Sequence, residues 1–408
     1  MQTSFRRLAA VAAGNALEFY DFLIFGFFAV QIGQAFFPKT DADTGLLLTL
    51  ATFGVGFLTR PLGGVVIGGL GDRLGRRPAM LMSFGLMGFS IVGLALTPSY
   101  ASICMTAPLL AVFFRLLQGF ALGGEVGPST AYLMEVAPPN RRGLYISVQF
   151  STQQFSTLCA GLVGLLLSRL MSPVMLVEWG WRIAMLIGVI ILPLGLMLRR
   201  SLPETLHTPS GALLPRLSRA QLVLALLSIL MLATITVSTY VMNYMVTFGT
   251  RTLGLEPGLA FGATVATGLC GSLFNPVGGM LADKFGARRV ILLAMPALLI
   301  ATVPVFLFMA TLKTAAALYA GAAILATLLA LGTPSVLVNL SEGLPPASRS
   351  GGIAIVYALA ISIFGGSAQF VVAWLTGAMH SALAPGFYMS GVLVIGMIAR
   401  WCLPSARA

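Results

Sequence analysis

Two carboxylates, Glu18 and Asp21, lie in the middle of an apolar run that extends from about residue 8 to residue 37. A helix of that length crosses a bilayer, and one acid at its centre costs roughly 2.5–3.5 kcal/mol to insert. The two acids are three residues apart and share a helix face, and Asn15 neighbours Glu18 in the same way. Because desolvation and a second negative charge both oppose ionisation, we expect the pair to bind a proton and to titrate as one unit, with either acid as the carrier. The alternative is an inert acid neutralised by an arginine.

Two arginines, Arg60 and Arg115, also fall deep inside apolar runs. An arginine near the membrane midplane must find an anion, and a substrate carboxylate offers two parallel hydrogen bonds to its guanidinium. The other anions available in the same half of the chain are Glu18, Asp21 and Glu125. Arg115, Gln118 and Glu125 lie on one helical stripe, so we assign Arg115 and Glu125 to proton coupling with the first acid pair. A purely structural ion pair is the alternative for both arginines.

The second half of the chain has neutral polar residues, and no acid or base, deep in its apolar runs. We therefore expect the charge chemistry in the first half and neutral substrate contacts in the second. Gln149 and Gln153 share a helix face, although each amide can instead hold two helices together. The predicted substrate-binding residues are Asn15, Tyr20, Arg60, Arg115, Gln118, Gln149, Gln153, Tyr240, Asn243, Tyr244, Asn275, Asn339 and Gln369.

The composition indicates a membrane protein. Of 408 residues 58% are hydrophobic and 9% are charged, against about 25% charged in a typical soluble domain. The net charge of +12 comes from short basic clusters between apolar runs, so it indicates membrane topology and not a nucleic-acid partner. Four separated cysteines and two distant histidines predict neither a disulfide framework nor a metal site.

Twelve runs are long enough to span a membrane as helices, and we predict an all-α polytopic protein. The runs cover residues 8–37, 45–71, 78–97, 102–135, 143–170, 181–200, 220–249, 258–282, 289–311, 314–340, 351–379 and 385–403. With the first residue inside, most lysines and arginines fall on the cytoplasmic side, so both termini should be cytoplasmic. The basic residues left in loops on the other side are Lys39, Arg169, Arg182, Arg251 and Lys313.

The chain divides into two similar halves. The breaker residues Pro203, Pro209 and Pro215 interrupt the longest polar stretch, so we predict a bundle over residues 1–201, a cytoplasmic linker over 202–219 and a second bundle over 220–408. The pattern Gly-x-x-x-Asp-Arg-x-Gly-Arg-Arg at residues 68–77 returns at residues 279–288, with Ala287 in place of an arginine. Parallel repeats of this kind are typical of transporters whose halves move about a central site.

These repeated loops resemble the signature of the major facilitator superfamily, as do Arg115-Leu-Leu-Gln-Gly119 and Pro203-Glu-Thr205. The segments at residues 14–22, 60–63 and 179–182 resemble its metabolite:proton symporter branch. Phe25-Gly-Phe27 and the glutamines at residues 149, 153 and 154 are most similar to citrate and tricarballylate carriers. The resemblance implies two six-helix bundles, no enzyme activity, no cofactor, and the proton as coupling ion.

The resemblance also implies a function. We expect a symporter in the bacterial inner membrane, working as a monomer in the lipid bilayer, that imports a di- or tricarboxylate such as citrate or tricarballylate by alternating access. The alternatives are carriers of shikimate, 2-oxoglutarate, aromatic acids or zwitterionic osmolytes, and an exporter of drugs or metabolites. The chain lacks a metal-ligand cluster, a nucleophile beside a base and a phosphate-binding loop, which disfavours an enzyme or an ATP-driven pump.

The repeated loops are predicted to form a cytoplasmic gate. In this superfamily's fold Asp72 would lie near Gly351 at the start of span eleven, where a helix dipole favours an anion, and Asp283 near Gly143 at the start of span five. Such contacts would close the inner side when the carrier opens outward. The predicted gate residues are Gly68, Asp72, Arg73, Gly75, Arg76, Arg77, Glu135, Arg142, Asp283, Arg288, Glu342 and Arg349.

Overall fold

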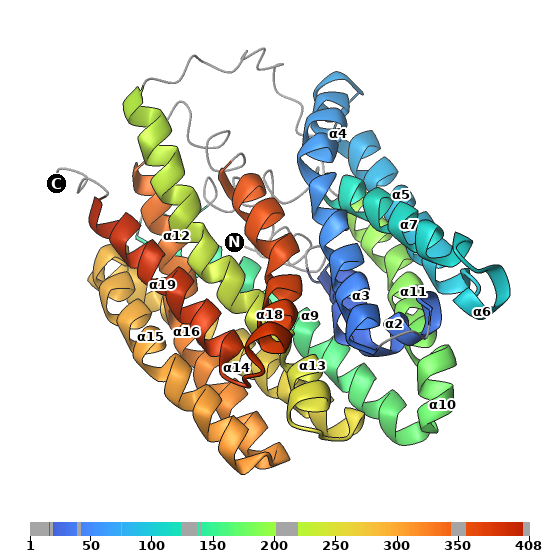
Figure 1. The fold of residues 1–408 in the computed structure, drawn as a ribbon. Helices are drawn as coiled ribbons and strands as arrows, with labels where there is room; N and C mark the ends of the chain where they lie inside the picture. Colours follow the sequence, from blue (N-terminus) through green and yellow to red (C-terminus); the bar gives the residue numbers. More distant parts are fainter. Residues whose placement is uncertain are drawn as a thin grey trace.

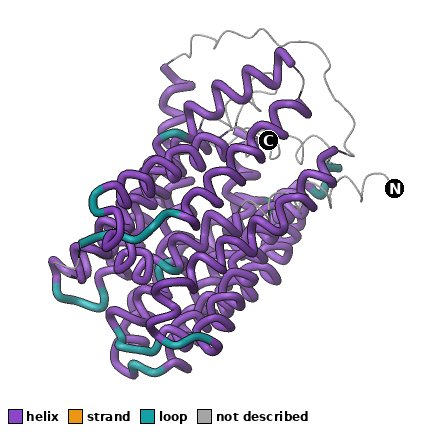
Figure 2. Tube along the Cα trace, turned by 90° about the vertical axis from the view of Figure 1, so that its right-hand side faces the viewer, coloured by secondary structure: helices purple, strands orange, loops and turns teal. Residues whose placement is uncertain are grey.

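A computed structural model of the protein describes residues 16, 19–38, 42–74, 76–123, 137–138, 140–200, 219–343 and 356–402. These residues form α-helices and three short π-helical turns joined by loops, and none of them is in a strand. The long helices run roughly side by side along one direction, with the loops gathered at the two ends (Figure 2).

The first half of the chain contains a short helix over Phe19–Phe27 and then ten further elements, of which Figure 1 labels the α-helices. These are α2 (Ala29–Phe36), α3 (Ala42–Leu58), α4 (Arg60–Leu74), α5 (Arg76–Leu96), α6 (Tyr100–Ile103), α7 (Thr106–Gly123), α9 (Arg142–Leu170), α10 (Pro173–Met175), η1 (Leu176–Gly180) and α11 (Trp181–Arg200). The second half contains α12 (Arg219–Asn243), α13 (Met245–Thr247), η2 (Phe248–Thr252), α14 (Pro257–Phe285), α15 (Ala287–Leu312), α16 (Ala315–Gly343), η4 (Ile361–Gly365), α18 (Gly366–Met379) and α19 (Ala384–Cys402).

Each of the twelve predicted spans has a helical counterpart. Among the described residues, 10 helices are long and apolar enough to cross a membrane. The first predicted span is the bent pair Phe19–Phe27 and Ala29–Phe36, whose axes differ by 69°. The third corresponds to the shorter apolar helix Leu81–Leu96. The sixth begins earlier than predicted, because α10, η1 and α11 together form the apolar stretch Pro173–Ile190.

The second span is interrupted at Thr59, between α3 and α4. Pro61 follows directly and has no N–H, so the carbonyl of Phe57 loses its helical hydrogen-bond partner. Thr59 connects the interrupted helix to α7, since its Oγ1 donates to the carbonyl of Leu116 at 2.6 Å. The break therefore fixes α3 and α4 against α7 at the depth of Arg60.

Glycines let α7 approach α3 and α4 at backbone contact. A Cβ on Gly119 would lie 1.5 Å from the carbonyl oxygen of Gly56, one on Gly63 would lie 1.8 Å from that of Phe120, and one on Gly123 1.9 Å from that of Arg60. No side chain fits at such distances, so only glycine permits this crossing. The contact brings the backbones that carry Arg60 and Arg115 together.

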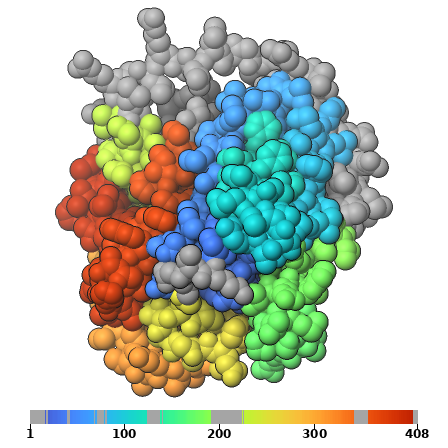
Figure 3. All heavy atoms as spheres, turned by 45° about the vertical axis from the view of Figure 1, so that its right-hand side comes forward, coloured from blue at the N-terminus to red at the C-terminus, as the bar shows by residue number. Residues whose placement is uncertain are grey.

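The two halves of the chain meet along two helix pairs. In one, α9 lies along α14, and a Cβ on Gly268 would come 2.3 Å from the backbone nitrogen of Leu158. In the other, α3 packs on α18, where a Cβ on Gly54 would come 2.4 Å from the carbonyl oxygen of Gly366. In the space-filling view the blue and cyan helices of the first half lie directly beside the orange and red helices of the second (Figure 3).

Gly119→Ala is expected to destabilise the protein strongly. A methyl group at this position overlaps the Gly56 carbonyl, and overpacking costs about 1–3 kcal/mol or more when the obstacle is backbone. Thermal unfolding of the purified protein in detergent should show a lowered midpoint. Gly85→Ala is the matched control, since nothing lies within 4 Å of its added Cβ. Equal midpoints for the two variants would contradict the proposed crossing.

Candidate substrate and proton site

Arg115 is buried at the centre of the first half of the chain. Its side chain is 1% exposed, Nη2 donates to the carbonyl of Phe53 at 3.1 Å, and Nη1 donates to Oε1 of Gln118 at 2.6 Å. Both acceptors are neutral, and Nε has no hydrogen-bond partner within the described part of the chain. A buried guanidinium thus keeps a donor available and lacks a described carboxylate to balance its charge.

Arg60 and Arg115 share one aromatic ring. Each guanidinium carbon lies 4.6 Å from the centroid of Phe22 on the Phe19–Phe27 helix. Arg60 also stacks on Phe57 at 4.2 Å, and Arg115 on Phe25 at 4.6 Å and Phe53 at 4.9 Å. Aromatic faces attract such cations, but they cannot neutralise two of them. We call Arg60, Arg115, Phe22, Phe25, Phe53 and Phe57 the two-arginine cluster.

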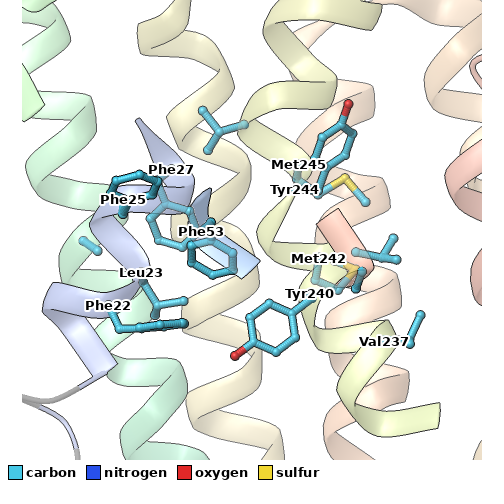
Figure 4. Close-up of a cluster of buried hydrophobic side chains, with 14 of the residues drawn as sticks. Phe22, Leu23, Phe25, Phe27, Phe53, Val237, Tyr240, Met242, Tyr244 and Met245 are labelled. Atoms are coloured by element: carbon cyan, nitrogen blue, oxygen red, sulfur yellow. The ribbon is translucent and has the colours of Figure 1, made fainter. Parts of the chain in front are cut away.

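The second half of the chain contributes Tyr240 to this cluster. Its ring centroid lies 5.6 Å from that of Phe57 and 6.1 Å from that of Phe53, and its hydroxyl is within electrostatic reach of both arginines. Figure 4 shows Tyr240 pointing from α12 toward Phe22 and Phe53. The cluster therefore lies where the two halves meet, as a site shared between them requires.

Buried amides surround this region. Gln369 of α18 lies against Gly26 and Phe53 of the first half. Gln153 of α9 is within hydrogen-bonding reach of Tyr357, which also senses the charge of Arg60. The Oε1 atom of Gln369 and the Nε2 atom of Gln153 are buried and have no described partner. Gln369 of the second half thus presents an amide oxygen without a described partner beside the cluster, and Gln153 of the first half lies near Tyr357.

The remaining predicted substrate residues are spread along the same interface. Asn275 donates to the carbonyl of Gly271 at 2.8 Å, and Gln154 packs on that glycine from α9. Asn243 is buried with an unpartnered Oδ1, and Tyr244 is buried one residue later. Gln149 is buried on α9, whereas Asn339 is only partly buried on α16. Asn275, Asn243, Tyr244 and Asn339 make no described contact with the side chain of Arg115.

Asp21 and Tyr20 face away from the two-arginine cluster. The Tyr20 hydroxyl donates to the carbonyl of Ala184 at 3.2 Å, and Oδ1 of Asp21 lies where a Cβ on Gly188 would be, 1.5 Å away. Both side chains therefore contact α11. Asp21, one of several candidate partners for the two arginines, lies apart from them in this structure, because successive residues of a helix point about 100° apart and Phe22 occupies the face toward the arginines.

Asp21 is nevertheless a buried acid, and one of its carboxylate oxygens is unpartnered among the described residues. Its side chain is 3% exposed, and Oδ1 has no hydrogen-bond partner among the described residues. The missing side chain of Gly188 provides the space for the carboxyl group. Glu18, Glu125 and Asn15, which complete the predicted charge and polar set, lie outside the described residues.

One half of the predicted cytoplasmic gate is present. Asp283 at the end of α14 accepts hydrogen bonds from the backbone N–H of Gly143 at 2.7 Å and of Leu144 at 2.9 Å. The carboxylate caps the N-terminus of α9, where the helix dipole favours an anion. This contact was expected from the sequence, and its gating role stays a prediction. Arg142 and Arg288 lie beside this contact in sequence and form no described ion pair.

The matching contact at the other repeat cannot be compared. Gly75, Glu135 and Arg349 lie outside the described residues, as does Gly351. Helices α4, α5 and α16 contain the other predicted gate residues, whose side chains are likewise outside the described part: Gly68, Asp72, Arg73, Arg76, Arg77 and Glu342.

An ion pair on the opposite side was not predicted. Arg251 of η2 pairs with Asp43 at the start of α3, which joins the two halves at the far end of the molecule from Asp283. The two residues are 208 positions apart, so no local pattern relates them. Their opposite charges, at the ends of the second and seventh predicted spans, are the sequence signal that could have indicated the pair. Tyr244 is within electrostatic reach of both.

The Trp179–Arg182 motif holds the first half together. Trp181 is fully buried and its ring lies 5.1 Å from that of Phe36. Arg182 donates to the carbonyls of Ala95 and Thr97 at the end of α5. We infer that this motif stabilises the outer end of the bundle and does not contact substrate.

Comparison with known proteins identifies the family. The profile of the Major Facilitator Superfamily matches residues 11–369. The chain belongs to the Major Facilitator Superfamily. It is 34% identical to a citrate-proton symporter of Klebsiella pneumoniae over 399 residues, covering 95% of this chain and 89% of that protein. It is 35% identical to the alpha-ketoglutarate permease of Escherichia coli (strain K12), covering 90% and 87%.

The fold agrees with this assignment. A crystal structure of a D-xylose-proton symporter superposes with a TM-score of 0.78 at 21% identity, covering 98% of this chain and 97% of that one. The predicted all-α membrane fold and superfamily are confirmed. The chain is a multi-pass membrane transporter and not an enzyme, as its sequence predicted.

Asp283→Ala is expected to open the cytoplasmic side. The variant loses two charge-assisted hydrogen bonds, each worth about 1.5–3 kcal/mol, so the contact between α9 and α14 should separate more often. A Ser147→Cys reporter, placed in a chain whose four native cysteines are replaced by serine, measures this, because Ser147 is buried and packs on Gly279. Labelling by a thiol reagent should accelerate by at least about tenfold.

Lys284→Ala is the matched control for that experiment. Lys284 is the exposed neighbour of Asp283 in the last turn of α14, and its removal should leave labelling of the reporter unchanged. An unchanged rate in the Asp283→Ala variant would show that the carboxylate does not hold this side closed.

Proposed function

We propose that this transporter imports a tricarboxylate, citrate first among the candidates, together with protons. Arg115 carries the proposal, because its buried guanidinium is bonded to neutral acceptors and keeps Nε without a described partner. A substrate carboxylate between Arg115 and Arg60 would supply the negative charge that the surrounding phenyl rings do not. The similarity to citrate-proton symporters supports the same substrate class.

Proton coupling follows from the charge of such a substrate. The membrane potential of a bacterium is negative inside, and each negative charge that enters costs about 2.3 kcal/mol per 100 mV. Protons that enter with the anion cancel this cost. We propose Asp21 and Glu18 as the proton-binding residues, with no other cofactor, and Glu125 as a further acid of the same half.

Alternating access provides the mechanism. We propose two six-helix bundles, over residues 1–201 and 220–408, that rock about the two-arginine cluster, working as a monomer with both termini in the cytoplasm. The Lys and Arg distribution supports that orientation. The Asp283 contact at one end and the Asp43–Arg251 pair at the other end join the halves, and we propose that they open alternately.

Uptake by proteoliposomes tests the substrate and the coupling. An inward pH gradient should drive accumulation of labelled citrate, and a protonophore should abolish it. Arg115→Lys keeps the charge but loses the planar fork that bonds Phe53 and Gln118, so its KM should rise by about tenfold or more, and Arg115→Gln should not transport. Arg169→Gln, an exposed arginine at the end of α9, is the control and should transport normally.

A dicarboxylate is the second candidate, favoured by the similarity to the alpha-ketoglutarate permease. Competition with unlabelled 2-oxoglutarate, tricarballylate and a zwitterionic osmolyte in the same vesicles ranks these substrates. Export of citrate from the vesicles would overturn the symport proposal. Citrate uptake at the same rate with and without the pH gradient and the protonophore would overturn it as well.

Asp21→Asn should uncouple transport from the proton gradient. An asparagine fits the space against Gly188 but does not take up and release a proton. The variant should exchange citrate across the membrane yet fail to accumulate it under an inward pH gradient. Glu178→Gln, an exposed acid of the same half, serves as the control. Accumulation at the normal level by Asp21→Asn would leave Glu18 as the proton carrier.

A further inference from the structure

A cavity lies in the second half of the chain, away from the two-arginine cluster. It has a volume of about 470 Å³ and lies between α12, α15, α16 and α19, close to the end of α19. Ligand pockets commonly measure about 300–1,000 Å³. Its walls are mostly aliphatic and include Met231, Ile291, Met295 and Val336. The cavity is large enough to hold part of a lipid, and its apolar walls suit an acyl chain.

The cavity opens on the outer surface of the second half. Leu292, Val394 and Ile398 line it and are each 40–59% exposed, which is expected of side chains that meet acyl chains. Helices α12, α15 and α19 form one edge of the molecule, opposite α5 and α6 (Figure 1). Trp401, 83% exposed, lies at its rim, and tryptophans gather at the membrane–water interface. The opening therefore faces the bilayer near its headgroup level.

One buried cation faces this apolar space. Arg400, in the last turn of α19, lines the cavity and is 6% exposed. Its Nε atom has no hydrogen-bond partner within the described residues. Of the acids whose side chains the structure describes, none pairs with it: Asp21, Asp43, Glu178, Glu256 and Asp283. Arg288, at the start of α15, is close enough to repel it.

We propose that the cavity binds an anionic phospholipid of the inner leaflet, with its phosphate on Arg400 and an acyl chain along Met295 and Val394. The choice of the inner leaflet rests on the proposed orientation with both termini in the cytoplasm. The lipid proposal does not depend on the proposed substrate or on proton coupling. A zwitterionic lipid carries its own cation beside the phosphate, so it would balance the charge of Arg400 less completely than an anionic lipid, and an unbalanced charge is costly in an apolar setting. A free phosphate would leave the aliphatic walls unfilled. An anionic lipid satisfies both.

Native mass spectrometry of the full-length transporter in detergent tests this. Phosphatidylglycerol should bind in preference to phosphatidylcholine of the same chain length, and glycerol phosphate should not displace it. Arg400→Gln should weaken phosphatidylglycerol binding about tenfold and leave the binding of phosphatidylcholine unchanged. Val394→Trp, which fills the cavity from an exposed wall position, should reduce the binding of both lipids.

Arg289→Gln is the control, since this exposed arginine belongs to the same end of α15 and does not line the cavity. Equal losses in the Arg289 and Arg400 variants would mean attraction by surface charge alone and would overturn the proposal. Displacement by glycerol phosphate would indicate an ion site. If lipid bound only after deletion of residues 403–408, the chain's own end would be the occupant. Binding is measured without transport, so failure here leaves the proposed function standing.

Discussion

Backbone contact of α7 with α3 and α4 is the constraint on which the centre of this transporter depends. Gly63, Gly119 and Gly123 have no side chain, so the helices approach until carbonyl oxygens occupy the positions of missing Cβ atoms. Association of helices in lipid gains little from hydrophobic burial, and small residues at the crossing supply the close packing instead. Arg60 and Arg115 extend from these helices and have little room except against the ring of Phe22.

This crossing gives the arginines a particular chemical character. Two cations held beside phenyl rings cannot reach water, and the hydrogen bonds of Arg115 go to neutral oxygens. The hydrogen bonds of Arg115 to neutral oxygens are the basis for our proposal that an anion binds here from outside the protein. Tyr240, Gln369 and Gln153 bring neutral groups from other helices to the same place, where they can orient a bound carboxylate without competing with it for the arginines.

A single short helix connects this site to the buried acid. Phe22 lies on the face of the Phe19–Phe27 helix toward the arginines, and Asp21, one residue before, lies on the face toward α11. In the proposed function, a change of charge on Asp21 would alter how this helix packs on Gly188 and so affect the position of Phe22. Substrate and proton would then act on different faces of one element, which separates their sites in space and still allows coupling.

The sequence alone determined the class of the protein. Twelve apolar runs, a basic bias on one side and repeated loop motifs predicted the fold and the superfamily, because hydrophobicity and charge placement are properties of composition and order. The resemblance to the superfamily also placed Asp283 near Gly143 at the start of α9, where its carboxylate caps the helix. The bend of 69° after Phe27 was not predicted, because no proline marks it.

Tertiary structure decided which groups meet. The sequence put Asp21, Arg60 and Arg115 at similar depths but could not say which way each side chain points, and rotation of the first helix places Asp21 on α11 and Phe22 on the arginines. It also gave no sign of the Asp43–Arg251 pair or of the cavity beside Arg400, which arise from helices distant in the chain. Depth in a membrane follows from counting residues along a helix, whereas partners follow from how helices rotate and cross, and that is fixed only when all of them pack together.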